Sequence, residues 1–367
     1  MRTDGQRIGF FDMTRAEKLI SALSLGKQDA VLLHNPSNMF YISGYTGGGV
    51  VFVSGECCAV VTDFRYTEQA EQESPGFEVH MIENGKSHED VVEALCVRLG
   101  IRKLYFEADS LTVQAFGRWQ DTVTGVEWLP VGDAVKALRE IKDAQELGLI
   151  ERACAITSDA FERILPQIKE GMTEKQLALL LEFDMRSHGA DGIAFPSIVA
   201  AGANGSLPHA VPSDYAICRG DMVTLDFGAK VGGYCADMTR TIAVGEPSAE
   251  MKKVYQTVKD AQQMAQDAVA AGKICRDVDA VARDYINSQG YEGRFGHGLG
   301  HCLGIDIHEN PRLNTVTNVP LKVGQVVTVE PGIYLPGVGG VRIENTVAVT
   351  ETGCRALTFP SRELIIL

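Results

Sequence analysis

Residues 222–242 read MVTLDFGAKVGGYCADMTRTI, and this stretch limits the folds that the sequence can adopt. In its first part apolar residues alternate with polar ones, which is typical of a strand with one face on a core. The glycines that follow permit a turn, and the chain then returns. A turn about Val231 and Gly232 places Asp226 directly opposite Asp237. Because like charges on adjacent strands destabilise a sheet, we expect a positive charge between them.

A second stretch, residues 326–344, repeats this arrangement. Its first strand ends at Glu330, and a turn about Gly337 places that residue opposite Glu344. One exposed carboxylate needs no special explanation, since most Asp and Glu side chains are solvated. Four carboxylates at matched positions in two hairpins need positive charge of similar size, which two divalent cations provide.

The two hairpins follow two copies of a helical pattern. Gly171 and Gly189 bracket a short helix in the first copy, and Gly272 and Gly290 bracket one in the second with the same spacing. A longer amphipathic helix precedes each short one. We therefore predict a duplicated α+β unit that closes around a pseudo-two-fold axis.

The first third of the chain has a different pattern. Helical segments alternate there with short β-rich runs, at residues 29–33, 49–53, 58–61 and 103–106. Residues 88–99 place their apolar side chains at helical spacing. We predict an α/β domain over residues 1–130 and a second domain over residues 131–367.

The composition limits the class of protein. The 367 residues carry a formal net charge of -14 with no dense Lys/Arg run, which argues against binding to nucleic acid or acidic lipid. No apolar stretch approaches the roughly 20 residues that span a bilayer, and we expect no signal peptide. The nine cysteines include no Cys-x-x-Cys and lie in apolar contexts, so they indicate reduced thiols. We expect a soluble, cytoplasmic protein.

The histidines are concentrated before the hairpins. Three of the eight fall within residues 297–308. His297 and His301 are four residues apart, but the glycines between them disfavour a helix by about 1 kcal/mol each relative to alanine. We expect a strand or loop, in which glycine permits close approach to a ligand. His308 follows on the polar face of an alternating run, and His209 precedes the first hairpin in the same way. This grouping indicates a functional site.

Together these residues resemble the metallopeptidases with the pita-bread fold, a family that includes methionine aminopeptidase, aminopeptidase P and prolidase. The resemblance rests on Asp226, on Asp237 eleven residues later, on HGLGH at 297–301, on Glu330 followed by Pro-Gly, and on Glu344.

The first domain resembles the N-terminal domain of the creatinase type, which methionine aminopeptidases lack. This likeness rests on its size, place and pattern, including NPSNMFYISG at residues 35–44. The resemblance covers nearly the whole chain. It implies an α/β N-terminal domain plus an α+β pita-bread catalytic domain with an internal pseudo-two-fold repeat.

The resemblance also implies a role for individual residues. Two divalent cations would be held by five ligands, Asp226, Asp237, His301, Glu330 and Glu344. The substrate site would contain His209 near the scissile bond, together with His297, His308 and Arg342. Mostly oxygen ligands favour Mn²⁺, with Co²⁺, Fe²⁺ or Zn²⁺ as alternatives.

The implied activity is that of an Xaa-Pro aminopeptidase, which removes the first residue from small peptides with proline in second position. A hydroxide that bridges the metals would attack the carbonyl. Glu330 would carry the proton to the leaving nitrogen, and a metal together with His308 or His209 would stabilise the oxyanion.

Three alternatives stay open: an Xaa-Pro dipeptidase (prolidase), a hydrolase of non-peptide C–N bonds, and a metal-free peptide-binding module on the same fold. The complete set of ligand residues argues against the last of these. The family resemblance favours a homodimer.

Overall fold

The computed structural model of the protein describes residues 13–367. Contacts divide this part of the chain between Arg139 and Glu140 into two units. Within residues 13–367, no helix has both the length and the apolar character that a membrane span requires. Residues 1–12, on which the expectation of no signal peptide mainly rests, lie outside the described part.

The first unit contains a six-stranded mixed sheet in the order β4-β3-β2-β1-β5-β6. Its strands are β1 (Asp29–Leu33), β2 (Val50–Ser54), β3 (Cys58–Thr62), β4 (Glu78–Met81), β5 (Lys103–Phe106) and β6 (Glu127–Pro130). Its helices are α1 (Arg15–Leu23), α2 (Pro36–Ser43), α3 (Thr67–Glu73), α4 (His88–Leu99), α5 (Val113–Thr122) and α6 (Ala134–Glu140). The predicted strands and the predicted helix over residues 88–99 are confirmed.

One face of this sheet carries a core of the first unit. Alternate residues of β1, β2 and β3 point to it, beginning with Ala30 and Leu32, and meet Leu95 of α4 and Trp119 of α5. The alternation follows from the two-residue repeat of a strand. The α/β architecture predicted for this part of the chain is confirmed.

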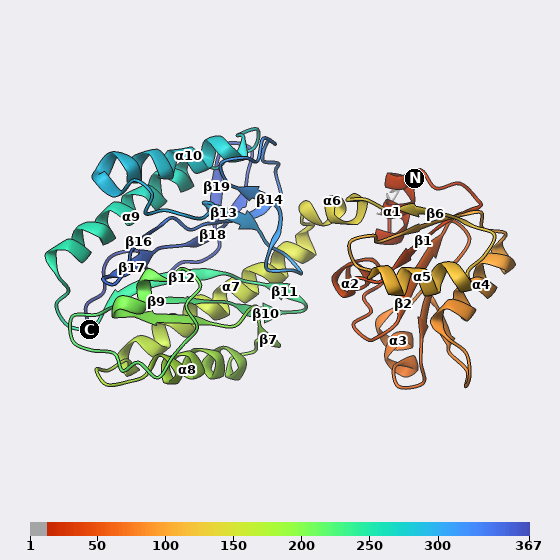
Figure 1. The fold of residues 1–367 in the computed structure, drawn as a ribbon, viewed down its shortest axis with the longest axis horizontal. Helices are drawn as coiled ribbons and strands as arrows, with labels where there is room; N and C mark the ends of the chain where they lie inside the picture. Colours follow the sequence, from red (N-terminus) through yellow and green to blue (C-terminus); the bar gives the residue numbers. More distant parts are fainter. Residues whose placement is uncertain (1–12) are drawn as a thin grey trace, which may run out of the picture. The chain divides into compact units, whose positions relative to one another are not determined.

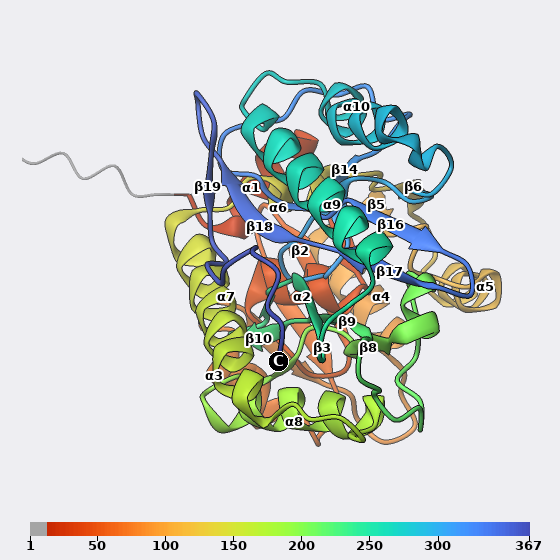
Figure 2. The same ribbon diagram turned by 90° about the vertical axis from the view of Figure 1, so that its left-hand side faces the viewer.

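The second unit places its strands between two helix pairs (Figures 1 and 2). The pairs are α7 (Ala144–Ile164) with α8 (Glu174–Ser187), and α9 (Ala249–Ala268) with α10 (Cys275–Ile286). Three short helical turns also occur in this unit. They are η1 (Leu165–Gln167) after α7, η2 (Gly202–Ser206) and η3 (Asn287–Tyr291) after α10.

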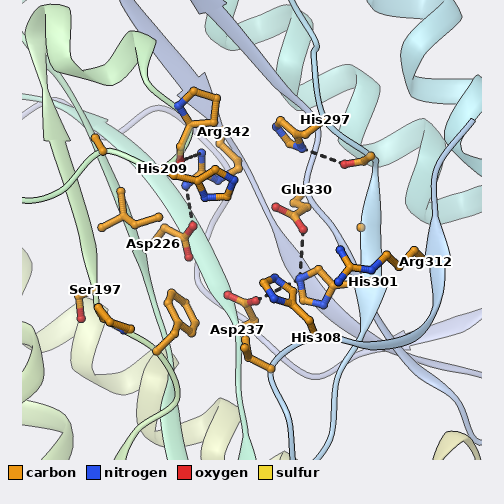
Figure 3. Close-up of a pocket in the computed structure, with 18 of the residues that line it drawn as sticks. Ser197, His209, Asp226, Asp237, His297, His301, His308, Arg312, Glu330 and Arg342 are labelled. Carbon is orange, nitrogen blue, oxygen red and sulfur yellow. Dashed lines mark hydrogen bonds and ion pairs between the residues drawn. The ribbon is translucent and has the colours of Figure 1, made fainter. Parts of the chain in front are cut away.

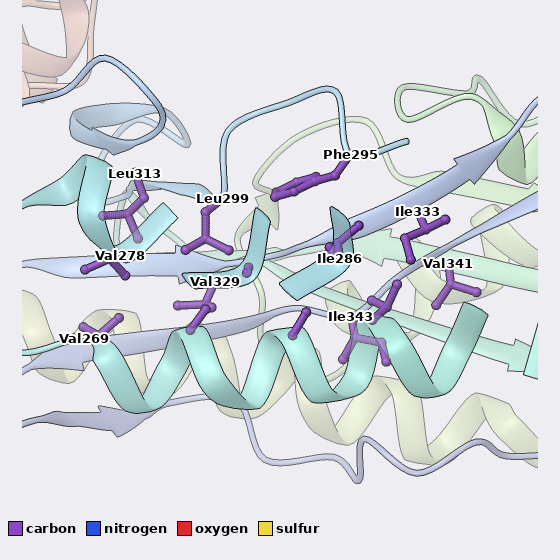
Figure 4. Packing of buried hydrophobic residues seen from close by; sticks show 14 of the residues in the cluster. Val269, Val278, Ile286, Phe295, Leu299, Leu313, Val329, Ile333, Val341 and Ile343 are labelled. Carbon is purple, nitrogen blue, oxygen red and sulfur yellow. The ribbon is translucent and has the colours of Figure 1, made fainter. Parts of the chain in front are cut away.

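The helix pairs confirm the internal repeat. The helix α8 begins at Glu174 after Gly171, and α10 begins at Cys275 after Gly272, with the same spacing. The apolar faces of α9 and α10 form one core with the strands beneath them, through residues such as Val278, Val329 and Ile343 (Figure 4).

The strands of the second unit form four sheets. The first half contributes β7 (Gly192–Ile193), β8 (Ile198–Ala201), β9 (Met222–Phe227), β10 (Ala229–Val231), β11 (Tyr234–Cys235) and β12 (Met238–Ala243), in the orders β12-β9-β8 and β11-β10-β7. The second half contributes β13 (Gly300–Cys302), β14 (Glu309–Leu313), β15 (Val326–Val329), β18 (Asn345–Val349) and β19 (Cys354–Ala356), in the order β14-β13-β15-β18-β19, and the pair β16 (Gly332–Leu335) with β17 (Gly339–Arg342).

The register of the first hairpin differs from the predicted one. Asp226 pairs with Thr239, so the prediction that it lies directly opposite Asp237 is wrong. The turn is centred on Gly232 and Gly233, whose φ angles of 54° and 84° favour glycine. Moving the centre of a turn by one residue moves every cross-strand partner by two, so Asp237 lies diagonally from Asp226.

The second hairpin keeps the predicted register. Val329 pairs with Asn345 on one side of the carboxylates, and Gly332 pairs with Arg342 on the other. Glu330 and Glu344 lie between these pairs and therefore face each other, as predicted. The structure thus presents one opposed and one diagonal carboxylate pair.

A buried histidine in the first unit makes its stability depend on pH. Burial, with the nearby positive charge of His88, lowers the pKa of His34 to about 4. The pKa of an unfolded histidine is about 6.5. Between these two values the unfolded chain binds more protons, so the contribution of His34 to stability is lost as the pH falls from 6.5 towards 4.

We therefore expect His34→Phe to make the first unit less sensitive to acid. The replacement keeps an aromatic ring against Trp119, whose ring centroid lies 5.1 Å from that of His34. Urea unfolding at pH 7 and pH 5 measures the effect: relative to the wild type, the midpoint of the variant should rise at the lower pH. An equal difference at both pH values would contradict a neutral buried imidazole.

Candidate metal centre

Three buried carboxylates converge in the second unit. Asp226 lies on β9, Asp237 directly before β12 and Glu344 directly before β18. One oxygen of each lies within 4.8 Å of the others. The Oδ1 atoms of the two aspartates and Oε1 of the glutamate are buried and accept no hydrogen bond from the described residues. Converging carboxylate oxygens without a protein partner are the donors that hard divalent cations prefer.

The electrostatics of these groups require positive charge. Burial, reinforced by the neighbouring carboxylates, raises the pKa of Asp237 and of Glu344 well above the usual range. Burial also raises the pKa of Glu330 to about 8. Carboxyl groups with such pKa values hold protons near neutral pH unless a cation replaces them. The cluster therefore fits a site for divalent metal.

The tautomer of His301 supports the same conclusion. Its Nδ1 lies 3.0 Å from the carbonyl oxygen of Cys302, and because a carbonyl only accepts, Nδ1 carries the proton. Burial lowers the pKa of His301 to about 3, so the ring is neutral and Nε2 is an acceptor. This Nε2 lies 3.6 Å from Asp237 Oδ2 and 3.4 Å from Glu330 Oε1. Three acceptors that face one another leave a place for a cation.

The structure thus brings the five predicted ligands together. Oxygens of Asp226, Asp237 and Glu344 converge, His301 adjoins Asp237, and Glu330 adjoins His301. The burial of most of these residues, the carboxylate oxygens without a hydrogen-bond partner and the unprotonated Nε2 of His301 all suit the binding of divalent metal. The individual assignment of these residues as ligands stays a prediction.

Hydroxyl groups orient two of the carboxylates. Thr239 Oγ1 donates to Glu344 Oε2 at 2.6 Å, and Thr328 Oγ1 donates to Glu330 Oε1 at 3.1 Å. Thr239 is the residue that faces Asp226 in the observed register. The corrected register therefore places a hydrogen-bond donor, instead of a second negative charge, opposite Asp226.

Arg342 contacts the cluster through Asp226, and all three of its side-chain nitrogens have protein partners. Its Nη2 pairs with Asp226 Oδ2 at 2.5 Å, and its Nε donates to Thr239 Oγ1 at 3.2 Å. Its Nη1 donates to the hydroxyl of Tyr334 at 2.9 Å and to the carbonyl of Pro208 at 3.2 Å. These contacts join parts of the site to one another and already occupy the guanidinium. The predicted role of Arg342 in substrate binding stays a prediction.

His297 is engaged in the same network. Its Nδ1 donates to the carbonyl of Gly298 at 2.8 Å, so Nε2 accepts from the hydroxyl of Tyr334, also at 2.8 Å. Burial lowers the pKa of His297 to about 4. The imidazole is therefore neutral, and both ring nitrogens already have protein partners.

His209 and His308 face the cavity of the site instead (Figure 3). The ring of His308 packs edge-on against that of His301, with centroids 4.5 Å apart, and burial lowers its pKa. Within residues 13–367, no side chain or backbone group forms a hydrogen bond with either ring. These two histidines are the predicted substrate residues that have ring nitrogens open to a ligand.

The cavity has a volume of about 510 Å³, a size suited to a small peptide. Phe195, Ile198 and Val211 contribute apolar lining, and Asp226, Asp237 and Glu330 contribute carboxylates. The guanidinium of Arg312 lies at the cavity near His308 (Figure 3). Arg312 has no ion-pair partner in the part of the chain that the structure describes.

A buried ion pair fixes the loop that carries His308. Lys142 Nζ lies 3.1 Å from Glu309 Oε2, with 1% and 8% of the two side chains exposed. Glu309 Oε1 also accepts from the backbone nitrogen of Asp306 at 3.2 Å. These contacts fix the turn between β13 and β14 that carries His308. One of the residues that fixes it, Lys142, precedes α7, the first helix of the repeat.

Sequence reasoning missed Tyr334 and Arg312. Tyr334 reads as an ordinary strand residue, and only the fold brings its hydroxyl between His297 and Arg342. Arg312 pairs across the strands with His301, which a correct pairing of β13 with β14 would have revealed.

Comparison with known proteins agrees with this geometry. The family model described as metallopeptidase family M24 matches residues 148–351, and that of the creatinase/prolidase N-terminal domain matches residues 15–141. The Xaa-Pro dipeptidase of Pyrococcus furiosus is 37% identical over 96% of this chain and 99% of its own length.

Solved structures show the same likeness. That of an Xaa-Pro dipeptidase from Bacillus anthracis has a TM-score of 0.92 and 42% identity over 96% of this chain and 99% of that one. An X-Pro aminopeptidase from Thermotoga maritima has a TM-score of 0.89 and 38% identity over 95% of this chain and 100% of that one.

We expect metal to stabilise the protein through the carboxylate cluster. Adding Mn²⁺ at about 100 times its Kd to chelator-treated protein should stabilise it by about 2.7 kcal/mol. The melting temperature, followed by differential scanning fluorimetry, should rise by at least about 3 °C.

Variants locate this effect. Asp237→Asn should reduce the shift, whereas Asp184→Asn, which alters a carboxylate paired with Arg163 away from the cluster, should keep it. An equal shift in both variants would place the stabilising metal elsewhere.

Proposed function

The chain belongs to metallopeptidase family M24 and carries a creatinase/prolidase N-terminal domain, and from this premise we propose that it hydrolyses the Xaa-Pro bond of short peptides, with Xaa-Pro dipeptides preferred. The Xaa-Pro dipeptidases among its relatives support the first part of this proposal. The second part rests on a charged residue of the cavity.

Arg312 is the observation that carries the dipeptide preference. Its guanidinium lines the cavity and has no ion-pair partner among residues 13–367. A dipeptide ends in a carboxylate one residue beyond the scissile bond, and a planar guanidinium can bind both carboxylate oxygens. A longer peptide has a neutral amide at that position, which gains less from the positive charge.

The residues of the site suit peptide hydrolysis. Glu330, whose pKa burial raises to about 8, can take a proton from the attacking water and pass it to the leaving proline nitrogen. His209 and His308 face the cavity and can donate to the carbonyl oxygen as negative charge develops there. The free amino group of the substrate would lie beside the acidic cluster, which suits an exopeptidase.

Divalent cations, when bound, supply a Lewis acid and lower the pKa of a water molecule. We propose that two are held by Asp226, Asp237, His301, Glu330 and Glu344. Four carboxylates and one imidazole make a donor set dominated by hard oxygen, and we propose manganese as the native metal for that reason.

The Xaa-Pro aminopeptidase reading is the second candidate. It is favoured by the likeness to the X-Pro aminopeptidase of Thermotoga maritima, which covers nearly the whole chain. The two candidates use the same hydrolytic residues. They differ in what meets the carboxyl side of proline, so that group is the one to vary.

We expect the free dipeptide Leu-Pro to be cleaved with a kcat/KM about tenfold to a hundredfold above that of Leu-Pro-amide, since hydrogen bonds between charged groups contribute about 1.5–3 kcal/mol. Arg312→Met should lower Leu-Pro to the level of the amide and leave the amide unchanged. Mass spectrometry of the products after restoration of Mn²⁺ measures these rates.

Controls separate the possible outcomes. Glu330→Gln should be inactive on every substrate, and Arg355→Met, which changes an arginine paired with Glu151, should behave as the wild type. Faster cleavage of Leu-Pro-Gly than of Leu-Pro, with no effect of Arg312→Met, would establish the aminopeptidase instead. No cleavage of any of these peptides by metal-loaded protein would disprove both candidates.

A further inference from the structure

Glu174, the first residue of α8, ties together the two ends of the segment that carries His209. Its side chain is fully buried. Oε1 accepts from the backbone nitrogen of Ala201 at 2.7 Å and from Asn204 Nδ2 at 3.0 Å. Oε2 accepts from the backbone nitrogen of Ser213 at 2.9 Å and from its hydroxyl at 2.6 Å. In the described chain, no lysine or arginine forms an ion pair with this carboxylate.

The N-terminus of α8 does not need the Glu174 carboxylate as a cap. The Oγ1 of Thr173 accepts from the backbone of Gln176, and the Gln176 side chain accepts from the backbone of Thr173, so the helix already has a complete capping box. Glu174 directs its charge away from its own helix and into the loop. Burying an ion at this position without a countercharge is costly, and the four donors of the loop offset that cost.

The tip of the loop has few other attachments. Leu207 and Val211 leave 58% and 82% of their surface exposed, so the small side chain of Ala210, which is buried, provides most of the apolar packing of the tip. Residues 208–212 nevertheless line the cavity. One further bond reaches this tip from the floor of the site, from Arg342 Nη1 to the carbonyl of Pro208.

We propose that Glu174 is a positioning residue for His209, and that its carboxylate clamp fixes the loop 201–213 so that the imidazole stays over the cavity. The inference rests on the role proposed for His209 in Xaa-Pro hydrolysis. A displacement of about 1 Å in a residue at the reacting atoms can lower a rate by about a hundredfold. A loop with an exposed apolar tip and a buried polar base gains that precision from its base.

Glu174→Gln tests the clamp with little change in volume. All four groups around the carboxylate donate to it, so an amide nitrogen at this position must face at least one donor. Ser213→Ala is a milder variant that leaves α8 intact and removes the hydroxyl, which donates to Glu174 and accepts from the backbone nitrogen of Tyr215 at 3.1 Å and from Asn204 Nδ2 at 3.4 Å. It tests the same clamp if Glu174→Gln does not fold.

Lys175→Met is the matched control. Lys175 follows Glu174 and pairs with Asp214, which follows Ser213, through an ion pair of 2.9 Å. Both side chains are exposed, and exposed ion pairs contribute little. The control therefore breaks a contact between the same two segments without touching the buried clamp.

The kinetic test is a double-mutant cycle on an Xaa-Pro dipeptide with Mn²⁺ present. We expect Glu174→Gln to lower kcat about tenfold or more, with a smaller change in KM. A misplaced His209 would stabilise the transition state less, while substrate binding would change little. Added to His209→Ala, it should change kcat by less than about twofold. An equal loss of kcat in both backgrounds, or no loss in either, would overturn the proposal.

Hydrogen exchange followed by mass spectrometry gives a second result that does not depend on activity. In Glu174→Gln, and to a smaller extent in Ser213→Ala, peptides over residues 201–213 should exchange about tenfold to a hundredfold faster, while α8 keeps its protection. Lys175→Met should exchange as the wild type. Unchanged exchange in both clamp variants would overturn the proposal.

The two readouts also separate this proposal from the proposed function. If the wild type and Lys175→Met do not cleave Xaa-Pro peptides, the proposed function fails irrespective of the clamp. If both cleave them and Glu174→Gln does so equally well, only the inference about Glu174 fails.

Discussion

Negative charge held out of water is the constraint on which the catalytic unit depends. Asp226, Asp237 and Glu344 are buried within one small volume, and each keeps an oxygen that no described group satisfies. Burying an ionised carboxylate without a partner is one of the largest costs that a protein can incur. The surrounding structure compensates for this cost in part, through hydroxyls and one arginine, and leaves the remainder for metal. That remainder gives the site its affinity for a cation, since a fully satisfied cluster would have no reason to bind one.

The fold explains why two hairpins are needed to assemble such a cluster. A single antiparallel pair with charges directly opposite would weaken its own pairing. Here Asp226 faces Thr239, so only the second hairpin has directly opposed carboxylates, and Glu344 of that hairpin meets the two aspartates of the first across the repeat. The helix pairs cover the strands from both sides (Figures 1 and 2), and the carboxylates meet solvent only at the cavity.

Much of this architecture could be predicted from the sequence, because it depends on local patterns. Alternation of apolar residues marked the strands, and the glycines bracketing α8 and α10 revealed the repeat. The predicted register of the first hairpin was wrong because two successive glycines allow more than one turn. Only their φ angles in the structure decide between these turns. The manganese, the homodimer and the cytoplasmic location stay predictions.

The groups that were missed depend on contacts between residues distant in the sequence. Tyr334 links His297 to Arg342, and Glu174 reaches Ser213, without any local pattern that distinguishes these side chains from their neighbours. Arg342 was predicted as a substrate residue and lines the cavity, but the partners of its donors could not be assigned from its position in the sequence.

The ion pair between Lys142 and Glu309 has a consequence for how this enzyme can be divided. The part that matches the peptidase family begins at residue 148, so a fragment cut there would lack Lys142. The buried ion pair that Lys142 makes with Glu309 would be lost with it. Lys142 therefore belongs to the second unit, although it precedes the residues that the family model matches. A fragment of the peptidase that keeps this ion pair has to begin before Lys142, upstream of the residues that the family model matches.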